Sequence, residues 1–474
     1  MAIRGTIEGF YGKPWTMLER EKHIRFLASV KGNTFVYSPK DDPYARDNWR
    51  EPYPAETLSK LGELASVAHD NRVNFVYAIS PGPTVSFSSA KDLQLLEDKF
   101  AALRTVGINN FYVALDDIEY TKWNSAEDSL KFGKSGPEAA GIAQAYLLNA
   151  LQQDLRKIDP AAPALIMVPT EYYNAKESPY KAALRKNLDP EIVIQWTGTD
   201  VVPPAIAVSD AVAAKKAFGQ KTLLWDNYPV NDYKQTSGRL LLAPYDRREA
   251  GLHRELSGIL SNPMNQEAAS RVAVTGVLAF AWNDDMYDAA RTWTFAAREL
   301  AGYDAATTIA LLDFFDTQHL APIFGSHPWQ EQAPAMKAKL DKVRDVLANG
   351  EIAERQQAIA QLAKYADEFT KAPAVIRSGI VDTAFLAEAK PWLQAMEQWG
   401  KSLKSTAMGL EAANKGNAEA ANYYQEAAAL AKEAAAIMSI PGATRFDGNI
   451  KIADGVLDRF IADAPNLIYV AAGK

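Results

Sequence analysis

Two adjacent aspartates, Asp116 and Asp117, follow a short apolar run at 111–115. A run of this length and composition is typical of a buried strand, which would place both carboxylates at the end of the strand. Two like charges this close cannot both ionise at low cost in a partly desolvated site, so one pKa is expected to rise. A protonated carboxyl beside an anionic one suits glycoside hydrolysis. One helix-capping aspartate and one solvated aspartate fit the same spacing equally well.

Aromatic and polar residues also end or follow the other apolar runs. The aromatic side chains among them offer flat faces on which sugar C–H groups can pack. Taken singly, each residue is as well explained by a core position, a helix cap or a solvated loop. The candidates for a shared site are Gly9, Phe10, Tyr11, Lys40, Tyr172, Trp196, Trp225, Asn227, Asp232 and Trp282.

Composition excludes several kinds of chemistry and partner. The chain has no cysteine, which excludes disulfides, thiolate catalysis and Cys-ligated zinc. Its histidines lie outside the expected strand ends, which disfavours a metal centre, so we expect neither a metal nor a cofactor. The formal net charge is -7 and no Lys/Arg-rich run is present, so nucleic acid is not an expected partner.

Hydropathy gives no sign of a membrane segment. No apolar stretch approaches the roughly 18 residues that suggest a membrane span. The first residues, MAIRGTIEGFYG, lack the apolar core of a signal peptide. We therefore expect no membrane association and a cytoplasmic location, although a secreted protein whose signal had been removed would have the same pattern.

Eight short apolar runs alternate with segments of helical periodicity in the first part of the chain. The runs lie at 3–9, 33–38, 73–79, 111–115, 164–168, 192–196, 222–225 and 274–282. This alternation predicts an α/β fold, a (β/α)8 TIM barrel whose catalytic groups come from the carboxyl ends of the strands. The intervals after the fourth and seventh runs are the longest, and extra loops are expected there.

Beyond Tyr303 the strand-like runs stop and Ala-rich segments with helical spacing follow. Apolar faces recur at 352–369 and 452–461, and a segment rich in small residues at 418–440 ends in Pro441-Gly442, a helix stop. We therefore predict a catalytic barrel at 1–303 and an all-α helical bundle domain at 304–474. The apolar faces must be buried, against one another, against the barrel or in a homo-oligomer.

Eight sequence blocks carry a resemblance to a known family. They are EGFYGKPW (8–15), YSPKDDPYARDNWRE (37–51), YAISPG (77–82), ALDDI (114–118), PTEYY (169–173), QWTGTDVV (195–202), WDNYPVNDY (225–233) and LSNP (260–263). In order and spacing they resemble the catalytic domain of glycoside hydrolase family 84, the O-GlcNAcases and their bacterial β-N-acetylglucosaminidase relatives. The helical region resembles, more loosely, the helical domain that follows the barrel in that family.

The resemblance implies retaining hydrolysis in which the substrate's own 2-acetamido carbonyl attacks the anomeric carbon and forms an oxazoline. Asp116 matches the carboxylate that orients and polarises the acetamido N–H. Asp117 matches the general acid that later acts as the base. The other matching positions are Tyr172 and Asn227 for the acetamido oxygen, Trp225 for its methyl group, and Gly9 (through its carbonyl), Lys40, Asp232 and Asn262 for the sugar hydroxyls.

These observations predict an exo-acting β-N-acetylglucosaminidase of the protein O-GlcNAcase type. Its substrates would be O-GlcNAc-modified proteins or β-N-acetylglucosaminide glycans. A hyaluronidase-like endo-glycosidase is the alternative among enzymes, because the barrel blocks do not separate the leaving groups. A non-catalytic glycan- or glycopeptide-binding protein is a further alternative, although such a protein needs no proton donor. Val201 is a candidate aglycone contact or a structural loop residue.

Overall fold

The computed structural model describes residues 1–322 and 330–468. The chain divides into two compact units. The first comprises Met1–Val230, Tyr245–Glu267 and Val274–Asp288, and the second comprises Asn231–Pro244, Ala268–Ala273 and Ala289–Lys474. Two short segments that precede residue 289 in the sequence therefore belong to the second unit.

Eight parallel strands of the first unit close into a barrel in chain order. β8 pairs with β1, with Gly258 opposite Ile3, which closes the ring. The predicted barrel fold is confirmed, and its first seven strands lie where the apolar runs place them. The strands are β1 (Ile3–Ile7), β2 (Thr34–Tyr37), β3 (Asn74–Ile79), β4 (Asn110–Ala114), β5 (Ile166–Val168), β6 (Val193–Trp196), β7 (Thr222–Asp226) and β8 (Leu256–Ser261).

Side chains from alternate strand positions form the barrel core, because successive Cβ atoms of a strand point to opposite faces. Most are aliphatic, and the core also contains Tyr112 and Trp225. Trp225 stands one residue before the end of β7, so the core reaches the carboxyl ends of the strands. The predicted site thus has an apolar floor.

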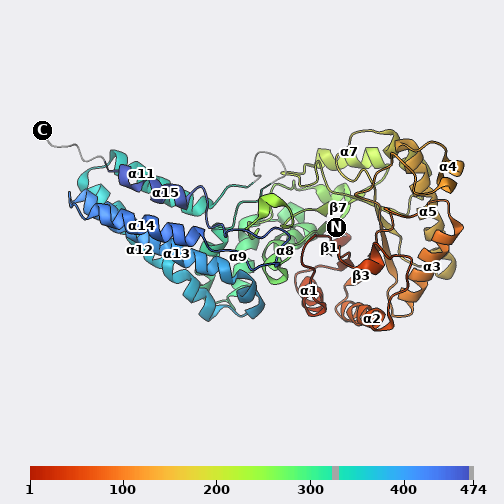
Figure 1. The fold of residues 1–474 in the computed structure, drawn as a ribbon, viewed down its shortest axis with the longest axis horizontal. Coiled ribbons are helices and arrows are strands. Elements are labelled where there is room, and N and C mark those ends of the chain that lie inside the picture. Colours follow the sequence, from red (N-terminus) through yellow and green to blue (C-terminus); the bar gives the residue numbers. More distant parts are fainter. Residues whose placement is uncertain (323–329, 469–474) are drawn as a thin grey trace. The chain divides into compact units, whose positions relative to one another are not determined.

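Helices surround the strands, and Figure 1 shows α1, α2, α3, α5 and α7 outside the barrel. Hydroxyl side chains cap several of them: Ser89, Ser125 and Ser178 each accept a hydrogen bond from a backbone N–H in the first turn. The helices that follow the barrel strands are α1 (Met17–Ser29), α2 (Ala55–Asp70), α3 (Ala90–Arg104), α4 (Ala126–Phe132), α5 (Pro137–Ile158), α6 (Pro179–Asn187), α7 (Val208–Phe218) and α8 (Glu267–Trp282), with short 3₁₀ helices η1 (Pro43–Ala45), η3 (Leu252–Arg254) and η4 (Asp284–Met286).

The predicted eighth strand at 274–282 is wrong, because these residues belong to α8 and the eighth strand is β8. Most of α8 is buried, including its polar residues Glu267, Ser270 and Thr275, so its apolar stretch lacks an exposed polar face and resembles a buried strand. β8 itself reads LSGILS, a weak strand pattern with a glycine in it. Gly258 is required by close packing, since a Cβ there would lie 2.2 Å from the carbonyl oxygen of Ile3.

The connection between β7 and β8 replaces the usual helix with irregular chain. Residues 227–255, all of them described, contain η3 and a second 3₁₀ helix, η2 (Lys234–Thr236), but no α-helix. The middle of this connection, Asn231–Pro244, belongs to the second unit. The other long interval, between β4 and β5, holds α4 and α5.

The second unit is helical, as the Ala-rich sequence predicts. Its long helices α12, α13 and α14 pack against one another in sequence order. On α12 the predicted apolar face is buried at Ile359, Leu362 and Phe369, whereas Ile352 is exposed. The helices are α9 (Ala289–Leu300), α10 (Ala305–Asp316), α11 (Pro334–Asn349), α12 (Ile352–Gly379), α13 (Thr383–Asn414), α14 (Ala420–Ala435) and α15 (Leu457–Asp463), followed by η5 (Ala464–Asn466).

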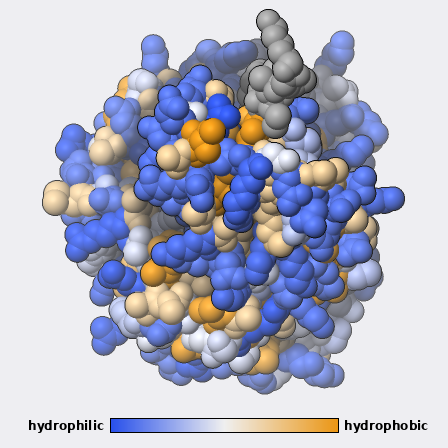
Figure 2. All heavy atoms as spheres, turned by 90° about the vertical axis from the view of Figure 1, so that its left-hand side faces the viewer, coloured by the Kyte–Doolittle hydropathy of each residue, from blue (hydrophilic) through white to orange (hydrophobic). Residues whose placement is uncertain are grey.

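The surface drawn in Figure 2 is mostly hydrophilic, and its hydrophobic side chains form small separate groups. A homo-oligomer formed through the helical region stays a prediction. Within the described ranges, no helix combines the length and the apolar character needed to cross a membrane.

Candidate active site

Asp116 and Asp117 lie at the carboxyl end of β4. Leu115 still donates a ladder hydrogen bond to the carbonyl oxygen of Val168 (3.0 Å), so the two aspartates are the first residues beyond the sheet. The backbone of Asp117 has a φ of 53°, in the left-handed region. Beyond this turn the two carboxylates have different partners.

Asp116 is the more enclosed member of the pair. Its carboxylate Oδ2 lies 3.8 Å from the ammonium Nζ of Lys40, and the two side chains are only 13% and 8% exposed. Burial raises the pKa of Asp116 above its ordinary value, and the negative charge of Asp117 adds to this rise, while Lys40 opposes it. The rise in one pKa predicted for the pair therefore falls on Asp116, the residue that the family blocks match to the anionic position.

Two tyrosines, which follow the carboxyl ends of β1 and β5, contact Asp117. The Tyr11 hydroxyl, after β1, donates to Oδ2 of Asp117 at 3.2 Å, and the Tyr172 hydroxyl, after β5, donates to Oδ1 at 3.3 Å. Both distances are long for O–H···O hydrogen bonds. Burial, together with the charge of Asp117, raises the pKa of Tyr172, which keeps its hydroxyl protonated as a donor.

Lys40 lies between Asp116 and two aromatic rings. Its Nζ lies 5.2 Å from the ring centre of Tyr11 and 5.8 Å from that of Trp225. A cation at these distances is attracted to the faces of aromatic rings. The ammonium is thereby held among Asp116 and two rings that the sequence separates widely.

A second cluster, which we call the amide cluster, lies at the ends of β7 and β8. Its centre is the carboxamide of Asn227, whose oxygen accepts from the indole N–H of Trp225 at 2.8 Å and from Nδ2 of Asn262 at 2.9 Å. The nitrogen of Asn227 donates to the carbonyl oxygen of Val201 at 2.6 Å. These three contacts fix the orientation of the carboxamide and leave one of its two N–H donors for another acceptor.

Gly9 joins the amide cluster to the end of β1. Its backbone N–H donates to Oδ1 of Asn262 at 3.3 Å. A Cβ at Gly9 would lie 2.5 Å from Cζ2 of Trp225, so only glycine lets the backbone approach this ring. Its position beside Trp225 therefore depends on the missing side chain.

The structure thus brings together eight of the nine predicted site residues through a chain of contacts. Asp232, the ninth, lies in Asn231–Pro244 of the second unit, and its place among the hydroxyl-binding residues stays a prediction. The eight are Gly9, Lys40, Asp116, Asp117, Tyr172, Trp225, Asn227 and Asn262.

Three aromatic residues that the sequence suggested for the barrel mouth do not present an open ring there. Phe10 and Trp196 are buried core residues, and the Trp196 indole N–H donates to the carbonyl oxygen of Asn174. Trp282 ends α8 and is 57% exposed, with the guanidinium of Arg4, near the start of β1, 5.0 Å from its ring centre. It therefore lies at the amino-terminal end of the barrel, opposite the candidate site.

Two contributions to the site differ from what the sequence suggested. Tyr11 was expected only as an apolar surface for a sugar, yet its hydroxyl contacts Asp117. Val201, which the sequence offered as an aglycone contact or a structural loop residue, contributes its backbone carbonyl to the amide cluster. Every residue has a backbone carbonyl, so no sequence signal could have identified this second contact.

Known proteins with similar sequences cover the barrel. The model of the β-N-acetylglucosaminidase family matches residues 4–316. Over 276 residues the chain is 34% identical to the protein O-GlcNAcases of Mus musculus and Rattus norvegicus, a match that covers 57% of this chain and 29% of each relative. The chain therefore matches less than a third of the length of these curated relatives.

Solved structures with the same fold cover nearly the whole chain. An O-GlcNAc hydrolase of Thermobaculum terrenum, solved as a mutant, has a TM-score of 0.83 and 27% identity, and the match covers 98% of this chain and 94% of that one. The structure of CpGH84B has a TM-score of 0.82 and 28% identity over 98% of this chain and 76% of that one. The family model and these relatives confirm the resemblance drawn from the sequence blocks: the chain belongs to glycoside hydrolase family 84, a family of β-N-acetylglucosaminidases.

Proposed function

We propose that this protein is an exo-acting β-N-acetylglucosaminidase that removes terminal β-linked N-acetylglucosamine with retention, through an oxazoline intermediate. The observation that carries the proposal is the acidic pair beside the amide cluster. Asp117 has two hydroxyl partners at 3.2 and 3.3 Å, while Asp116 faces Lys40 at 3.8 Å. One carboxyl can therefore exchange a proton while the other stays enclosed beside the ring-flanked cation.

In the first step, the acetamido carbonyl oxygen of the substrate attacks the anomeric carbon, and the bond from that carbon to the leaving oxygen breaks. Asp117 gives its proton to the leaving oxygen, and Asp116 accepts a hydrogen bond from the acetamido N–H. Burial favours the neutral form of Asp116 in the free protein. A donated N–H and the positive charge that develops on the oxazoline ring both favour its anion, so the substrate itself stabilises the reactive charge state.

In the second step, Asp117 takes a proton from water, whose oxygen attacks the anomeric carbon and opens the oxazoline. The products are N-acetylglucosamine with its original anomeric configuration and the free leaving group, and Asp117 is again protonated. The carboxylate thus acts as acid and then as base. The long contacts from Tyr11 and Tyr172 support this exchange, because neither holds Asp117 in a short hydrogen bond.

The amide cluster would hold the acetamido group in position for attack. The remaining N–H of Asn227 is available for the acetamido oxygen, with the Tyr172 hydroxyl as the second donor, and Trp225 would wall the methyl group. Gly9, Lys40, Asp232 and Asn262 would bind the sugar hydroxyls. Fixing the internal nucleophile in this way supplies the proximity that intramolecular attack requires.

Sequence similarity to mammalian protein O-GlcNAcases supports O-GlcNAc-modified proteins as a substrate class. The experiment compares turnover of an aryl β-N-acetylglucosaminide, an O-GlcNAc peptide and hyaluronan by the purified protein. We expect turnover of the first two and none of hyaluronan. Binding of N-acetylglucosamine without any turnover would instead favour a glycan-binding protein, and chain cleavage within hyaluronan would favour an endo-glycosidase.

A thiazoline analogue of the oxazoline tests the mechanism separately. Because the site is proposed to favour the cyclised geometry, the thiazoline should bind more tightly than N-acetylglucosamine. Trapping of a covalent glycosyl-enzyme on any carboxylate would contradict the substrate-assisted route while leaving the glycosidase activity intact.

A further inference from the structure

Asp226, the residue before Asn227 in the sequence, forms a buried ion pair with Arg248. The guanidinium of Arg248 donates from Nε and Nη2 to the two carboxylate oxygens of Asp226, at 2.9 and 2.7 Å, and both side chains are at most 1% exposed. The Tyr245 hydroxyl donates to the same carboxylate at 2.6 Å. Asp226 is the last residue of β7, so three strong hydrogen bonds anchor the strand end from which Asn227 projects.

The same guanidinium also reaches the loop between β6 and α7. Nη2 of Arg248 lies 3.4 Å from the carbonyl oxygen of Pro203. The backbone next to Arg248 is paired with this loop, because the Ile206 N–H donates to the carbonyl oxygen of Arg247 at 3.0 Å. Val201, whose carbonyl holds the Asn227 nitrogen, belongs to the same loop.

Arg248 therefore contacts two of the three segments that orient the Asn227 carboxamide. One segment is the end of β7, and the other is the loop that carries Val201. Successive strand side chains point to opposite faces, so Asp226 can face Arg248 while Trp225 and Asn227 face the site. We infer that Arg248, with Tyr245, is a positioning residue that sets the orientation of Asn227 from outside the site. This inference rests on the proposed function, in which Asn227 binds the acetamido oxygen.

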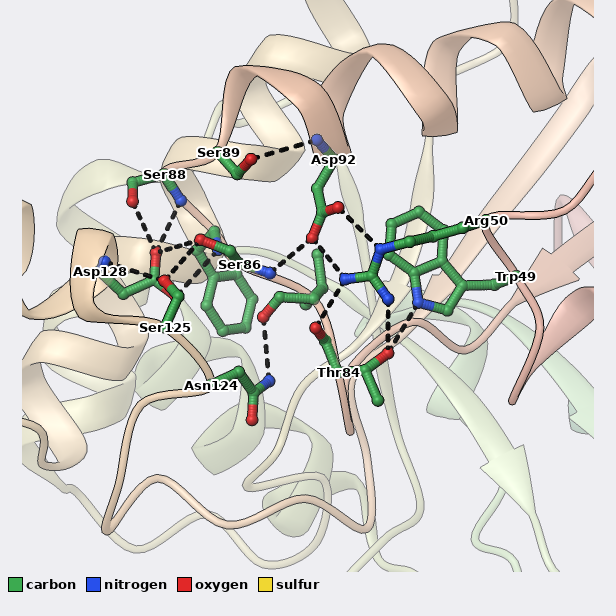
Figure 3. Close-up of polar contacts among 12 residues, drawn as sticks. Trp49, Arg50, Thr84, Ser86, Ser88, Ser89, Asp92, Asn124, Ser125 and Asp128 are labelled. Carbon is green, nitrogen blue, oxygen red and sulfur yellow. Dashed lines mark hydrogen bonds and ion pairs between the residues drawn. The ribbon is translucent and has the colours of Figure 1, made fainter.

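A second Arg–Asp pair in the barrel provides a matched control (Figure 3). Arg50 donates from Nε and Nη2 to both oxygens of Asp92, at 2.8 and 2.6 Å, and also donates to the carbonyl oxygen of Thr84 at 2.7 Å. This pair has the same fork geometry as Arg248–Asp226 and also an additional carbonyl contact, although the Arg50 side chain is 37% exposed and that of Arg248 is 1% exposed. The loop that it holds, between β3 and α3, carries none of the predicted site residues.

The experiment compares Arg248→Lys with Arg50→Lys in the full chain. Lysine keeps the positive charge but cannot place two donors in the planar fork of a guanidinium. The first measurement is the 15N–1H signal of the Trp225 indole, which donates to Asn227, assigned among the 10 tryptophans by Trp225→Phe. The second is kcat and KM for an aryl β-N-acetylglucosaminide, together with the melting temperature.

Arg248→Lys should shift the Trp225 indole signal and lower kcat by about 10- to 100-fold, since a small displacement of a positioning group costs this much. Arg50→Lys should leave the Trp225 indole signal and kcat unchanged, whether or not it changes the melting temperature. An unshifted signal with normal kcat in a folded Arg248→Lys protein would overturn the inference, as would equal losses in both variants.

Two further measurements keep the inference testable. If Arg248→Lys does not fold, Tyr245→Phe removes one hydrogen bond to Asp226 and keeps the ion pair. A shifted Trp225 signal in that variant supports the inference, and an unshifted one overturns it. If the wild-type protein turns over no glycoside, the proposed function fails, and the indole signal alone still decides whether Arg248 positions Asn227.

Discussion

The acidic pair and the amide cluster face the same site but are held in different ways. Around Asp117 and Asp116 the polar contacts are long, at 3.2, 3.3 and 3.8 Å. Around Asn227 they are short, at 2.6, 2.8 and 2.9 Å, and they use both ends of the carboxamide. The difference fits the proposed function, in which the carboxylates exchange protons with the substrate and the amide keeps a fixed orientation.

The largest expected effect tests the acidic side through Asp117→Asn. Loss of the proton donor should reduce turnover by about 10²- to 10⁴-fold for poor leaving groups. The first step with an activated phenol should be affected much less, because that phenol departs without protonation. Rates across a series of aryl leaving groups check this expectation, and an equal loss across the series would contradict the acid assignment.

A smaller effect is expected on the amide side from Asn227→Ala. The change leaves the indole N–H of Trp225 without its acceptor, and an unmet buried polar group costs about 1–3 kcal/mol. Both the free energy of unfolding and the affinity for a thiazoline analogue should therefore fall. Denaturant titration and calorimetric binding measure the two quantities, and weakened binding at unchanged stability would show that the cluster is not a rigid support.

A matched pair of tyrosines sharpens the comparison further. Tyr11 and Tyr172 both donate to Asp117, but only Tyr172 is proposed to bind the acetamido oxygen as well. Tyr172→Phe should therefore lower kcat/KM more than Tyr11→Phe does. Equal losses would limit Tyr172 to holding Asp117.

The smallest expected effect is a pH dependence of stability. Burial raises the pKa of Asp116, so the folded protein keeps a proton that the unfolded chain releases in the window above the ordinary value of 3.8. The stability contributed by this group is full below that value and is lost as the pH rises through the raised pKa. The advantage of Asp116→Asn over the wild type in unfolding free energy should thus grow with pH in this window.

Asp304 provides a control of opposite sign for the same titration. Hydrogen bonds from the backbone and side chain of Thr307 lower its pKa, so its contribution is present above the ordinary value and lost as the pH falls. Asp304→Asn should therefore lose stability relative to the wild type as the pH rises. A constant difference between Asp116→Asn and the wild type would contradict the burial of Asp116.

Sequence patterns located most of the barrel because seven strands are buried, short and followed by polar residues. They failed at β8, where a weak LSGILS strand precedes a helix buried on most of its faces, so hydropathy favoured the wrong segment. Asn262, which the family blocks singled out without assigning it to a strand end, follows β8 directly, and its part in binding sugar hydroxyls stays a prediction. The roles of Val201 and Arg248 depend on a backbone carbonyl and on a contact between distant loops, neither of which has a periodicity to detect.

The left-handed backbone at Asp117, with its φ of 53°, restricts the set of amino acids that this position can accept. Aspartate, asparagine and glycine adopt such a conformation readily, whereas a residue such as alanine is strained by about 1 kcal/mol. A survey of all substitutions at position 117 would therefore mix two effects, the missing proton and the distorted turn. Asparagine separates them, because it keeps the turn and lacks only the acid.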